Sequence, residues 1–314
     1  MANARLSPED ESLIAAREAA SLHPDVAALA LAHGEALLRT QHLPEAIAEL
    51  QRALRLDHEF AAARFALGLA WLSAGEAEKA LEAFACLDPS QLGLGDRLDE
   101  AKAMLARPRS DPGYVRHLFD QFAADYDARM LSQLAYAAPR ILRELFDLVM
   151  PGRDGLAVLD LGCGTGLSGT AFRDVAARLD GIDLSPAMVA KARAKGLYDA
   201  LAVADIEAAL GRGGRDYELL VAADTLVYLG DLSTVFAAAA RCLRPGGVLL
   251  FTVERKDGEG FELGPKRRWR HSEACLREEA ARAGFEIAGL VACAPRREAN
   301  MPVDGFAAAF SASV

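Results

Sequence analysis

A glycine-rich turn with a single acidic residue is the part of the sequence best suited to chemistry. Asp160 opens the pattern D-x-G-x-G-x-G, whose glycines are Gly162, Gly164 and Gly166. Glycines adopt positive φ and let the backbone lie against a ligand, and a helix that starts there presents free N–H groups. Leu167 stands where a dinucleotide fingerprint would need its third glycine. Singly, these residues could be a helix cap and ordinary turns, but together they favour a ligand loop that does not hold a diphosphate.

A second acidic residue follows at a suitable interval. Asp183 ends the next apolar segment, 23 residues after Asp160. A carboxylate about 20 residues beyond such a turn suits hydrogen bonding to both hydroxyls of a ribose. Ser185 and Pro186 then fit the N-cap and first turn of a helix. The two acids and the glycines together predict a site for a nucleoside with a free 2′-hydroxyl.

Alternating strands and helices must position these residues. Short apolar runs alternate with helical stretches, which predicts a doubly wound, mostly parallel sheet of α/β class. Two further runs close the chain without a helix between them and are expected to pair antiparallel at one edge. The seven expected strands are 156–161, 179–183, 199–203, 218–223, 247–253, 285–293 and 305–312.

These motifs resemble those of the class I S-adenosylmethionine-dependent methyltransferases, and the resemblance covers about residues 114–314. It implies that Asp160 faces the cationic methionine part of the cofactor, that Asp183 binds the ribose, and that Asp205 meets the adenine amino group. Taken alone, Asp205 is equally suited to cap a helix. The cofactor-binding residues that the resemblance implies are Asp160, Gly162, Cys163, Gly164, Gly166, Asp183, Leu184, Met188, Asp205, Ile206, Ala223 and Tyr126.

An amphipathic segment ahead of the glycine-rich turn resembles the lid helix of small-molecule methyltransferases. It spans residues 118–127 and includes Phe122 and Tyr126, which are expected to close over the cofactor. The alternative is an aromatic stripe that packs onto the sheet. Beyond the fourth strand, residues 225–228 are expected to border the transferring methyl group.

The first third of the chain carries an internal repeat. Gly34, Ala46 and Leu50 recur 34 positions later as Gly68, Ala80 and Phe84, a spacing that resembles the tetratricopeptide repeat (TPR). We expect an all-α, TPR-like domain over residues 1–107 and the methyltransferase domain over 108–314, because prolines and a glycine crowd residues 107–113. Residues 7–24 fit a partial first unit, and the early Pro89 predicts a shortened last helix.

Composition narrows the possible partners and the compartment. A formal charge of -10 argues against nucleic acid or an anionic membrane as the main partner. The five cysteines are scattered and odd in number, without metal-ligand spacing, so we expect reduced thiols and no metal. We see no signal peptide and no apolar run long enough for a membrane span, and expect a cytoplasmic protein.

The expected reaction is methyl transfer to an oxygen of a small anionic or carboxyl-bearing metabolite. His271 and Tyr228 are the candidate catalytic residues, with Asp224 and Glu254 as further candidate bases. A surface histidine is the alternative for His271. Cations gathered in two loops predict anion binding, unless they are solvated loop charges. The candidate substrate-binding residues are Arg268, Arg270 and Arg296, beside Lys266, Arg267 and Arg297.

Two other functions fit the same motifs. The enzyme could methylate a protein or peptide that the helical repeats recruit, or the chain could bind S-adenosylmethionine without turning it over, as an interaction module. The repeats could also only stabilise the fold or form a dimer. The sequence leaves the acceptor, the acceptor atom and the oligomeric state open.

Overall fold

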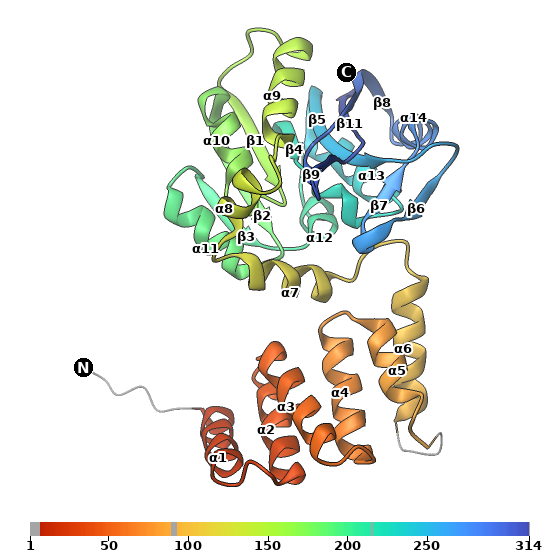
Figure 1. The fold of residues 1–314 in the computed structure, drawn as a ribbon. Coiled ribbons are helices and arrows are strands. Elements are labelled where there is room, and N and C mark those ends of the chain that lie inside the picture. The colour runs from red at the N-terminus through yellow and green to blue at the C-terminus, as the bar shows by residue number, and fades with distance from the viewer. Residues whose placement is uncertain (1–6, 89–92, 215, 314) are drawn as a thin grey trace, which may run out of the picture. The chain divides into compact units, whose positions relative to one another are not determined.

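The structure, a computed structural model, describes residues 7–88, 93–214 and 216–313. The chain forms two compact units, Met1–Arg107 and Pro108–Val314. The first unit consists of antiparallel helices (Figure 1), and no helix in the described residues is long and apolar enough to cross a bilayer. Its helices are α1 (Pro8–Leu22), α2 (Ala27–Arg39), α3 (Leu43–Leu56), α4 (Ala61–Ser73), α5 (Ala77–Phe84) and α6 (Leu94–Ala106).

The repeated glycines of the first unit let successive helices approach closely. A Cβ atom added to Gly34 in α2 would lie 2.7 Å from Cγ of Leu50 in α3, and one added to Gly68 would overlap the ring of Phe84 in α5. The large residue of one helix therefore fills the space that glycine leaves on its partner. Helix α5 has 8 residues against 14 in α3, as expected for a shortened last helix. Pro89, on which that expectation rested, lies outside the described residues.

The second unit is built on a mostly parallel sheet. Its main path in the described residues has seven strands in the order β3-β2-β1-β4-β5-β11-β8. Strand β11 lies between β5 and β8 and runs antiparallel to both. The strands are β1 (Leu156–Leu161), β2 (Ala176–Asp183), β3 (Ala200–Val203), β4 (Tyr217–Ala222), β5 (Leu243–Arg255), β8 (Phe285–Cys293) and β11 (Gly305–Ala312).

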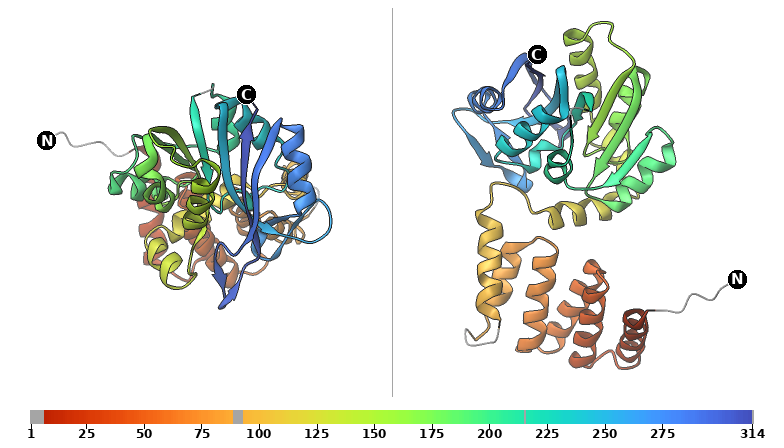
Figure 2. Two further views of the ribbon diagram at one scale, coloured as in Figure 1. Left: turned by 90° about the horizontal axis from the view of Figure 1, so that it is seen from above. Right: turned by 180° about the vertical axis from the view of Figure 1, so that it is seen from behind.

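Helices cover both faces of this sheet (Figure 2). Leu156 and Val158 of β1 pack in one core cluster with α9 and α10, whereas Leu159 and Leu161 pack in another with α12, α13 and α14. Alternate residues of a strand thus serve opposite faces. The helices of this unit are α7 (Pro112–Phe122), α8 (Tyr126–Ser132), α9 (Ala138–Val149), α10 (Leu167–Phe172), α11 (Pro186–Lys195), α12 (Ile206–Gly211), α13 (Ser233–Cys242) and α14 (Glu273–Arg282).

Two local features differ from the sequence-based expectations. The lid helix expected over 118–127 is divided, because α7 ends at Phe122 and α8 starts at Tyr126. Four short strands were not expected, since two or three residues give too little pattern to recognise. They are β6 (Phe261–Leu263), β7 (Trp269–His271), β9 (Arg297–Glu298) and β10 (Met301–Pro302).

Candidate functional site

The glycine-rich turn is held against the end of β2. Gly162, Gly164 and Gly166 all have positive φ, at 72°, 53° and 94°. Gly162 and Cys163 donate backbone hydrogen bonds to the carbonyl of Ile182, at 2.8 and 2.9 Å. A Cβ atom on Gly162 would overlap the side chain of Thr225. Only glycine satisfies both the conformation and the space at this position.

The carboxylate of Asp183 ties the turn to the next helix. Its Oδ2 accepts a hydrogen bond from the backbone N–H of Gly164 at 2.9 Å, and its Oδ1 accepts one from Ser185 at 2.8 Å. Burial raises the pKa of this carboxyl, which the backbone donors at Ser185 and Gly164 oppose. Since each carboxylate oxygen has a further lone pair, Asp183 can still accept from a ligand.

Asp160 is buried behind the glycines with one oxygen unused. The hydroxyl of Tyr198 donates to its Oδ2 at 2.7 Å, whereas its Oδ1 is buried and has no partner among the described residues. Burial raises the pKa of Asp160 to about 7. A buried carboxylate oxygen without a partner is costly, so this site favours a cationic or donor group beside it. Tyr198, which the sequence analysis missed, packs against Gly169 and Gly181.

A cavity opens beside the glycine-rich turn, and we call it the glycine-loop cavity. Tyr126, Thr225 and Tyr228 line it together with residues of the turn. The sequence-predicted residues that line it are Tyr126, Gly162, Gly164, Asp183, Leu184, Asp205, Ile206, Ala223 and Tyr228. Cys163 lines a small adjoining pocket with Gly164 and Tyr136.

Besides Asp160, two predicted cofactor residues, Met188 and Gly166, do not line the cavity. Met188 is completely buried, and its backbone N–H bonds to the Ser185 hydroxyl. Gly166 is the N-cap of α10 and packs near Tyr198. Both residues therefore support neighbouring groups. The expectation differs for Met188 because an apolar residue in the first turn of a helix can turn toward the core as readily as toward a ligand.

Charged residues also line the glycine-loop cavity. Asp205 is the N-cap of α12 and accepts from the backbone N–H groups of Glu207 and Ala208, both at 3.1 Å. Its second oxygen pairs with Arg109 at 2.6 Å. Arg109 and Ser110 also line the cavity. The sequence analysis missed these two residues, because an arginine between prolines carries no recognisable motif.

The lid segment, which comprises α7 and α8, is bonded to the loops around the glycine-loop cavity. Asp120 accepts from the Ser185 hydroxyl, and Asp127 accepts from Thr165 and from Lys195. The ring of Phe119 contacts those of Tyr126 and Tyr228 edge-on, with centroids 6.1 and 5.7 Å apart. The break between the two helices thus brings Tyr126 to the cavity. Phe122 does not line the glycine-loop cavity.

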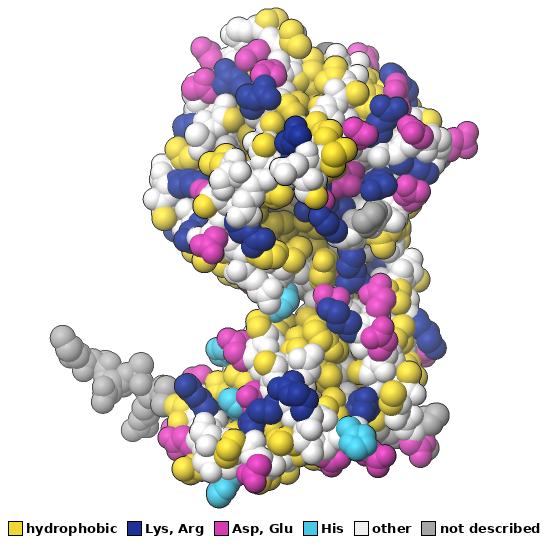
Figure 3. All heavy atoms as spheres, viewed as in Figure 1, with side chains coloured by type: hydrophobic (Ala, Val, Ile, Leu, Met, Phe, Trp, Pro, Cys, Tyr) yellow, Lys and Arg dark blue, Asp and Glu magenta, His cyan; other side chains and the backbone are white. Residues whose placement is uncertain are grey.

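A second cavity, the lid cavity, lies next to the first. It has a volume of about 520 Å³. Phe119, Tyr126, Asp224 and Tyr228 line both cavities. Figure 3 shows a recess on this face with hydrophobic atoms inside it and Lys and Arg side chains along its rim. The lid segment contributes mostly apolar side chains to the lid cavity, together with Arg129. Lys266, Arg268, Arg296 and Glu298 contribute further charges.

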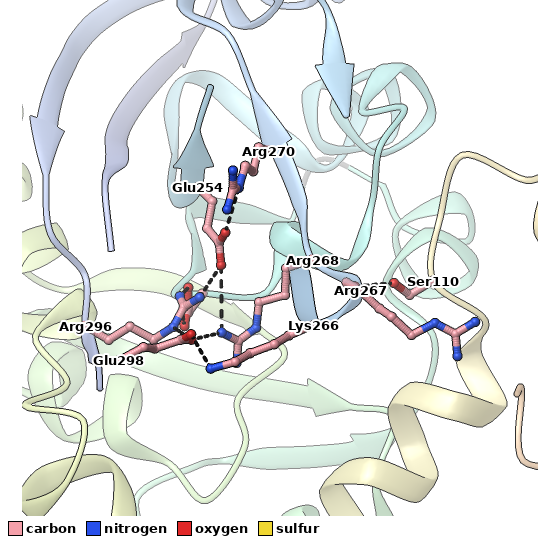
Figure 4. A network of polar contacts seen from close by, with 9 residues as sticks. Ser110, Glu254, Lys266, Arg267, Arg268, Arg270, Arg296 and Glu298 are labelled. Carbon is pink, nitrogen blue, oxygen red and sulfur yellow. Dashed lines mark hydrogen bonds and ion pairs between the residues drawn. The ribbon is translucent and has the colours of Figure 1, made fainter. Parts of the chain in front are cut away.

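The charged residues belong to an arginine cluster of four cations and three carboxylates, most of which Figure 4 labels. Arg296, 1% exposed, lies at its centre and pairs with Asp224, Glu254 and Glu298. Arg268 pairs with Glu298 and donates to the hydroxyl of Tyr228. The members of the cluster are Lys266, Arg268, Arg270, Arg296, Asp224, Glu254 and Glu298.

This pairing revises the expected role of the cations. Arg296 and Arg268 line the lid cavity, but Arg270 lies outside it and pairs with Glu254 at 3.6 Å. Burial alone would raise the pKa of Glu298, but Lys266, Arg268 and Arg296 lower it to about 2. The loop cations are thus largely neutralised within the protein. Asp224 has a positive φ of 59°, an uncommon conformation that often marks a functional site.

His271 is placed away from both cavities. It is completely buried in β7, and its Nε2 donates to the carbonyl of Gly230 at 2.9 Å. Burial lowers its pKa to about 4, so the imidazole is neutral at physiological pH. Neither the catalytic prediction nor the surface alternative describes this histidine. The short strand β7 turns it inward, and that strand was not recognised in the sequence.

Comparison with known proteins agrees with this architecture. A methyltransferase domain family matches residues 158–247, and a TPR repeat family matches residues 34–75. Methyltransferase-like protein 27 of Homo sapiens is 34% identical over 35% of this chain and 46% of its own length. Malonyl-[acyl-carrier protein] O-methyltransferase of Enterobacter lignolyticus is 34% identical over 34% of this chain and 43% of its own length. The chain thus spans about half the length of the curated relatives it matches.

Solved structures show the same fold. The 1,6-didemethyltoxoflavin-N1-methyltransferase of Burkholderia thailandensis, solved with bound 1,6-didemethyltoxoflavin and S-adenosylhomocysteine, superposes with a TM-score of 0.52 at 19% identity. The match covers 66% of this chain and 92% of that structure. At this identity the likeness shows the fold alone. Together with the family matches, it establishes that the chain carries a class I methyltransferase domain of the S-adenosylmethionine-dependent type, preceded by a TPR repeat.

Proposed function

We propose that this protein transfers the methyl group of S-adenosylmethionine to an oxygen of a small anionic or carboxyl-bearing metabolite. The observation that carries the proposal is the pair of adjoining cavities. Asp183 lines the glycine-loop cavity, and Asp160 is buried next to the glycine-rich turn with its Oδ1 unpartnered. Part of the arginine cluster lines the lid cavity. Since Tyr126 and Tyr228 line both, a methyl group held in the first can reach an acceptor in the second.

The residues of the glycine-loop cavity fit S-adenosylmethionine. The unpartnered Oδ1 of Asp160 suits the ammonium of the methionine part, and Asp183 suits the ribose hydroxyls. Leu184 and Ile206 offer apolar surface to the adenine. When bound, the cofactor supplies a methyl group on a sulfonium, whose sulfur departs neutral and needs no proton. The protein therefore has to position the reactants and exclude water.

No described residue of the lid cavity is placed to act as a general base. Asp224 and Glu298 are paired with Arg296, and Glu254 lies behind them in the same ion pairs. Burial raises the pKa of Tyr228, so its hydroxyl stays protonated. An alcohol or phenol would need a base, whereas a carboxylate arrives ionised. This favours a carboxylate acceptor over a hydroxyl.

The charge of the lid cavity supports an anionic acceptor. The described lining holds the cations Lys266, Arg268, Arg296 and Arg129 against the carboxylates Asp224 and Glu298. Arg129 also lines the cavity, with its guanidinium 4.5 Å from the ring centre of Phe122, and pairs with no carboxylate in the described part of the chain. A guanidinium on an aromatic ring keeps its N–H groups available. The printed name of the Enterobacter relative, an O-methyltransferase, supports oxygen as the acceptor atom.

Methyl-labelled S-adenosylmethionine tests this proposal directly. The full chain is incubated with labelled cofactor and a cell extract, and label is followed into small molecules and into protein. We expect label in small molecules and its release as volatile methanol under mild alkali, because a methyl ester hydrolyses and a methyl ether does not. Alkali-stable label would contradict a carboxylate acceptor. Failure to bind S-adenosylhomocysteine and to transfer label would overturn the whole proposal.

A protein substrate is the second candidate, because a TPR repeat precedes the methyltransferase domain. Repeats of this kind present extended surfaces that bind peptides. The same labelling experiment separates the two functions. Label that stays with the protein fraction after denaturation would favour this candidate over a small acceptor.

A further inference from the structure

The segment that precedes the lid, Pro108–Asp111, is bonded along the rim of the glycine-loop cavity. Ser110 donates its backbone N–H to the carbonyl of Tyr228 at 2.8 Å. The carbonyl of Pro108 accepts from Gly230 at 2.7 Å and from Asp231 at 3.0 Å. A Cβ atom on Gly230 would lie 2.8 Å from that carbonyl oxygen, so the close approach depends on glycine. The backbone of this segment is therefore fixed where Arg109 begins.

The side chain of Arg109 bridges two carboxylates on α12. One terminal nitrogen lies 2.6 Å from Oδ2 of Asp205, and the other contacts Glu207. All three side chains are about one-fifth exposed, at 21%, 22% and 20%. A guanidinium presents its donors in a planar fork, which suits two acceptors at fixed positions. A lysine could not hold both carboxylates in the same way.

This bridge determines how Asp205 presents its free lone pair. Oδ1 is used by the two backbone donors at the start of α12, and Oδ2 accepts from Arg109. Because Oδ2 has one further lone pair, Asp205 can accept a single additional donor at the cavity wall. Without Arg109, the two neighbouring carboxylates would repel each other, and only the backbone donors on Oδ1 would hold Asp205.

We propose that Arg109 is a positioning residue for the cofactor: it orients Asp205 to accept the 6-amino group of adenine, which makes Pro108–Asp111 part of the cofactor site. This rests on the proposed function, because it assumes that S-adenosylmethionine occupies the glycine-loop cavity. Arg109 acts through Asp205 and therefore selects adenine over a purine with an oxygen at position 6. The segment Pro108–Asp111 precedes residues 158–247, which match the methyltransferase domain family.

The test compares two ligands in the full-length chain. S-adenosylhomocysteine carries the 6-amino group, and S-inosylhomocysteine carries a carbonyl oxygen in its place. Calorimetry gives the affinity of each for the unmodified chain, Arg109→Ala, Arg109→Lys and Asp205→Asn. The control is Arg277→Ala, which removes an exposed pair with Glu273 on α14.

We expect the unmodified chain to prefer S-adenosylhomocysteine roughly tenfold or more, since an acceptor facing a carbonyl oxygen is left unpaired. Arg109→Ala should bring this preference close to parity, Arg109→Lys should reduce it in part, and the control should keep it. A merely structural role would weaken both ligands equally and leave the ratio unchanged, and that result overturns the proposal. If Arg109→Ala does not fold, Arg109→Lys decides by the same ratio. If the unmodified chain binds neither ligand, the proposed function falls as well.

Discussion

The two cavities share four wall residues but are built from different parts of the chain. At the centre of the glycine-loop cavity are the backbone of Gly162 and Gly164, both with positive φ, and Asp183, which accepts from main-chain N–H groups. The lid cavity is shaped by side chains that come from α7, α8 and the loops before β7 and β9. The glycine turn and Asp183 follow two neighbouring strands, β1 and β2, whereas the lid cavity depends on how distant segments meet. The glycine turn and Asp183 are therefore positioned by the sheet, and the acceptor end is positioned by the ion pairs of the arginine cluster.

The largest effect should follow from removing the centre of the arginine cluster. In Arg296→Ala, Asp224 and Glu254 lose their buried partner and Glu298 loses one of three cations. Removing one partner of a buried ion pair costs about 3–5 kcal/mol. We expect denaturant titrations to show a loss of this size in the free energy of unfolding of the methyltransferase unit.

A matched exposed arginine separates this effect from a general one. Arg140 pairs with Glu144 on the surface of α9, with side-chain exposures of 66% and 61%. Arg140→Ala should change stability by no more than about 1 kcal/mol. Equal losses in the two variants would mean that the cluster does not organise the lid cavity.

Asp160 provides the next largest effect, on cofactor affinity. Asp160→Asn keeps the shape and a partner for Tyr198 but removes the charge that the ammonium would meet. Loss of a hydrogen bond to a charged group costs about 1.5–3 kcal/mol, which is roughly tenfold to hundredfold in affinity. Calorimetry with S-adenosylhomocysteine should show this loss. An unchanged affinity would place the ammonium elsewhere.

The same carboxyl makes the affinity depend on pH. Burial raises the pKa of Asp160 to about 7 from an ordinary value of 3.8. In the free protein, its contribution to stability is therefore largest below pH 4 and is lost as the pH rises through 7. Binding of an ammonium requires the ionised form, so affinity should increase as the pH rises toward 7 and then level off.

Two variants test whether Asp160 causes this dependence of affinity on pH. Asp160→Asn should flatten it. Tyr198→Phe should move its midpoint to higher pH, because the Tyr198 hydrogen bond lowers the pKa that burial raises. If both variants show the same dependence of affinity on pH as the unmodified chain, another group must cause it.

A smaller effect is expected at Gly162. Alanine there would meet the side chain of Thr225 and would have to hold a φ of 72°. Strain of this kind costs about 1–3 kcal/mol. Adding Thr225→Ala to Gly162→Ala should restore the part of the thermal stability that the overlap removes. No recovery in the double variant would show that the backbone conformation alone matters.

The difference between features set by neighbouring strands and features set by distant segments explains what the sequence could predict. The strands 156–161, 285–293 and 305–312 are confirmed residue for residue, since apolar runs between turn residues identify them. The glycine turn and Asp183 are adjacent to such strands, so their meeting follows from the order of the sheet. Local pattern and sheet topology thus predicted the fold and the position of the glycine-loop cavity.

Residues outside these patterns could not be predicted. Tyr198 meets Asp160 only because Gly169 and Gly181 leave room for its ring. His271 is buried because β7, three residues long, pairs with the end of β5. The carboxylates that neutralise Arg296 come from segments up to 72 positions away. Such long-range pairings depend on side-chain packing, which periodicity and spacing do not describe.

The smallest effect, on the acceptor alone, distinguishes the two cavities most directly. Arg268 lines the lid cavity but not the glycine-loop cavity, and its side chain is 20% exposed. The substrate here is the small molecule that takes up label from S-adenosylmethionine. Arg268→Gln should raise the KM for this acceptor about tenfold through the loss of a charged hydrogen bond, while the affinity for S-adenosylhomocysteine stays unchanged. Arg255 lies beside the cluster, pairs with the exposed Asp257 and does not line the lid cavity, so Arg255→Gln is the control. If Arg268→Gln and Arg255→Gln give the same KM, the acceptor lies elsewhere, and the two cavities would not divide cofactor from acceptor.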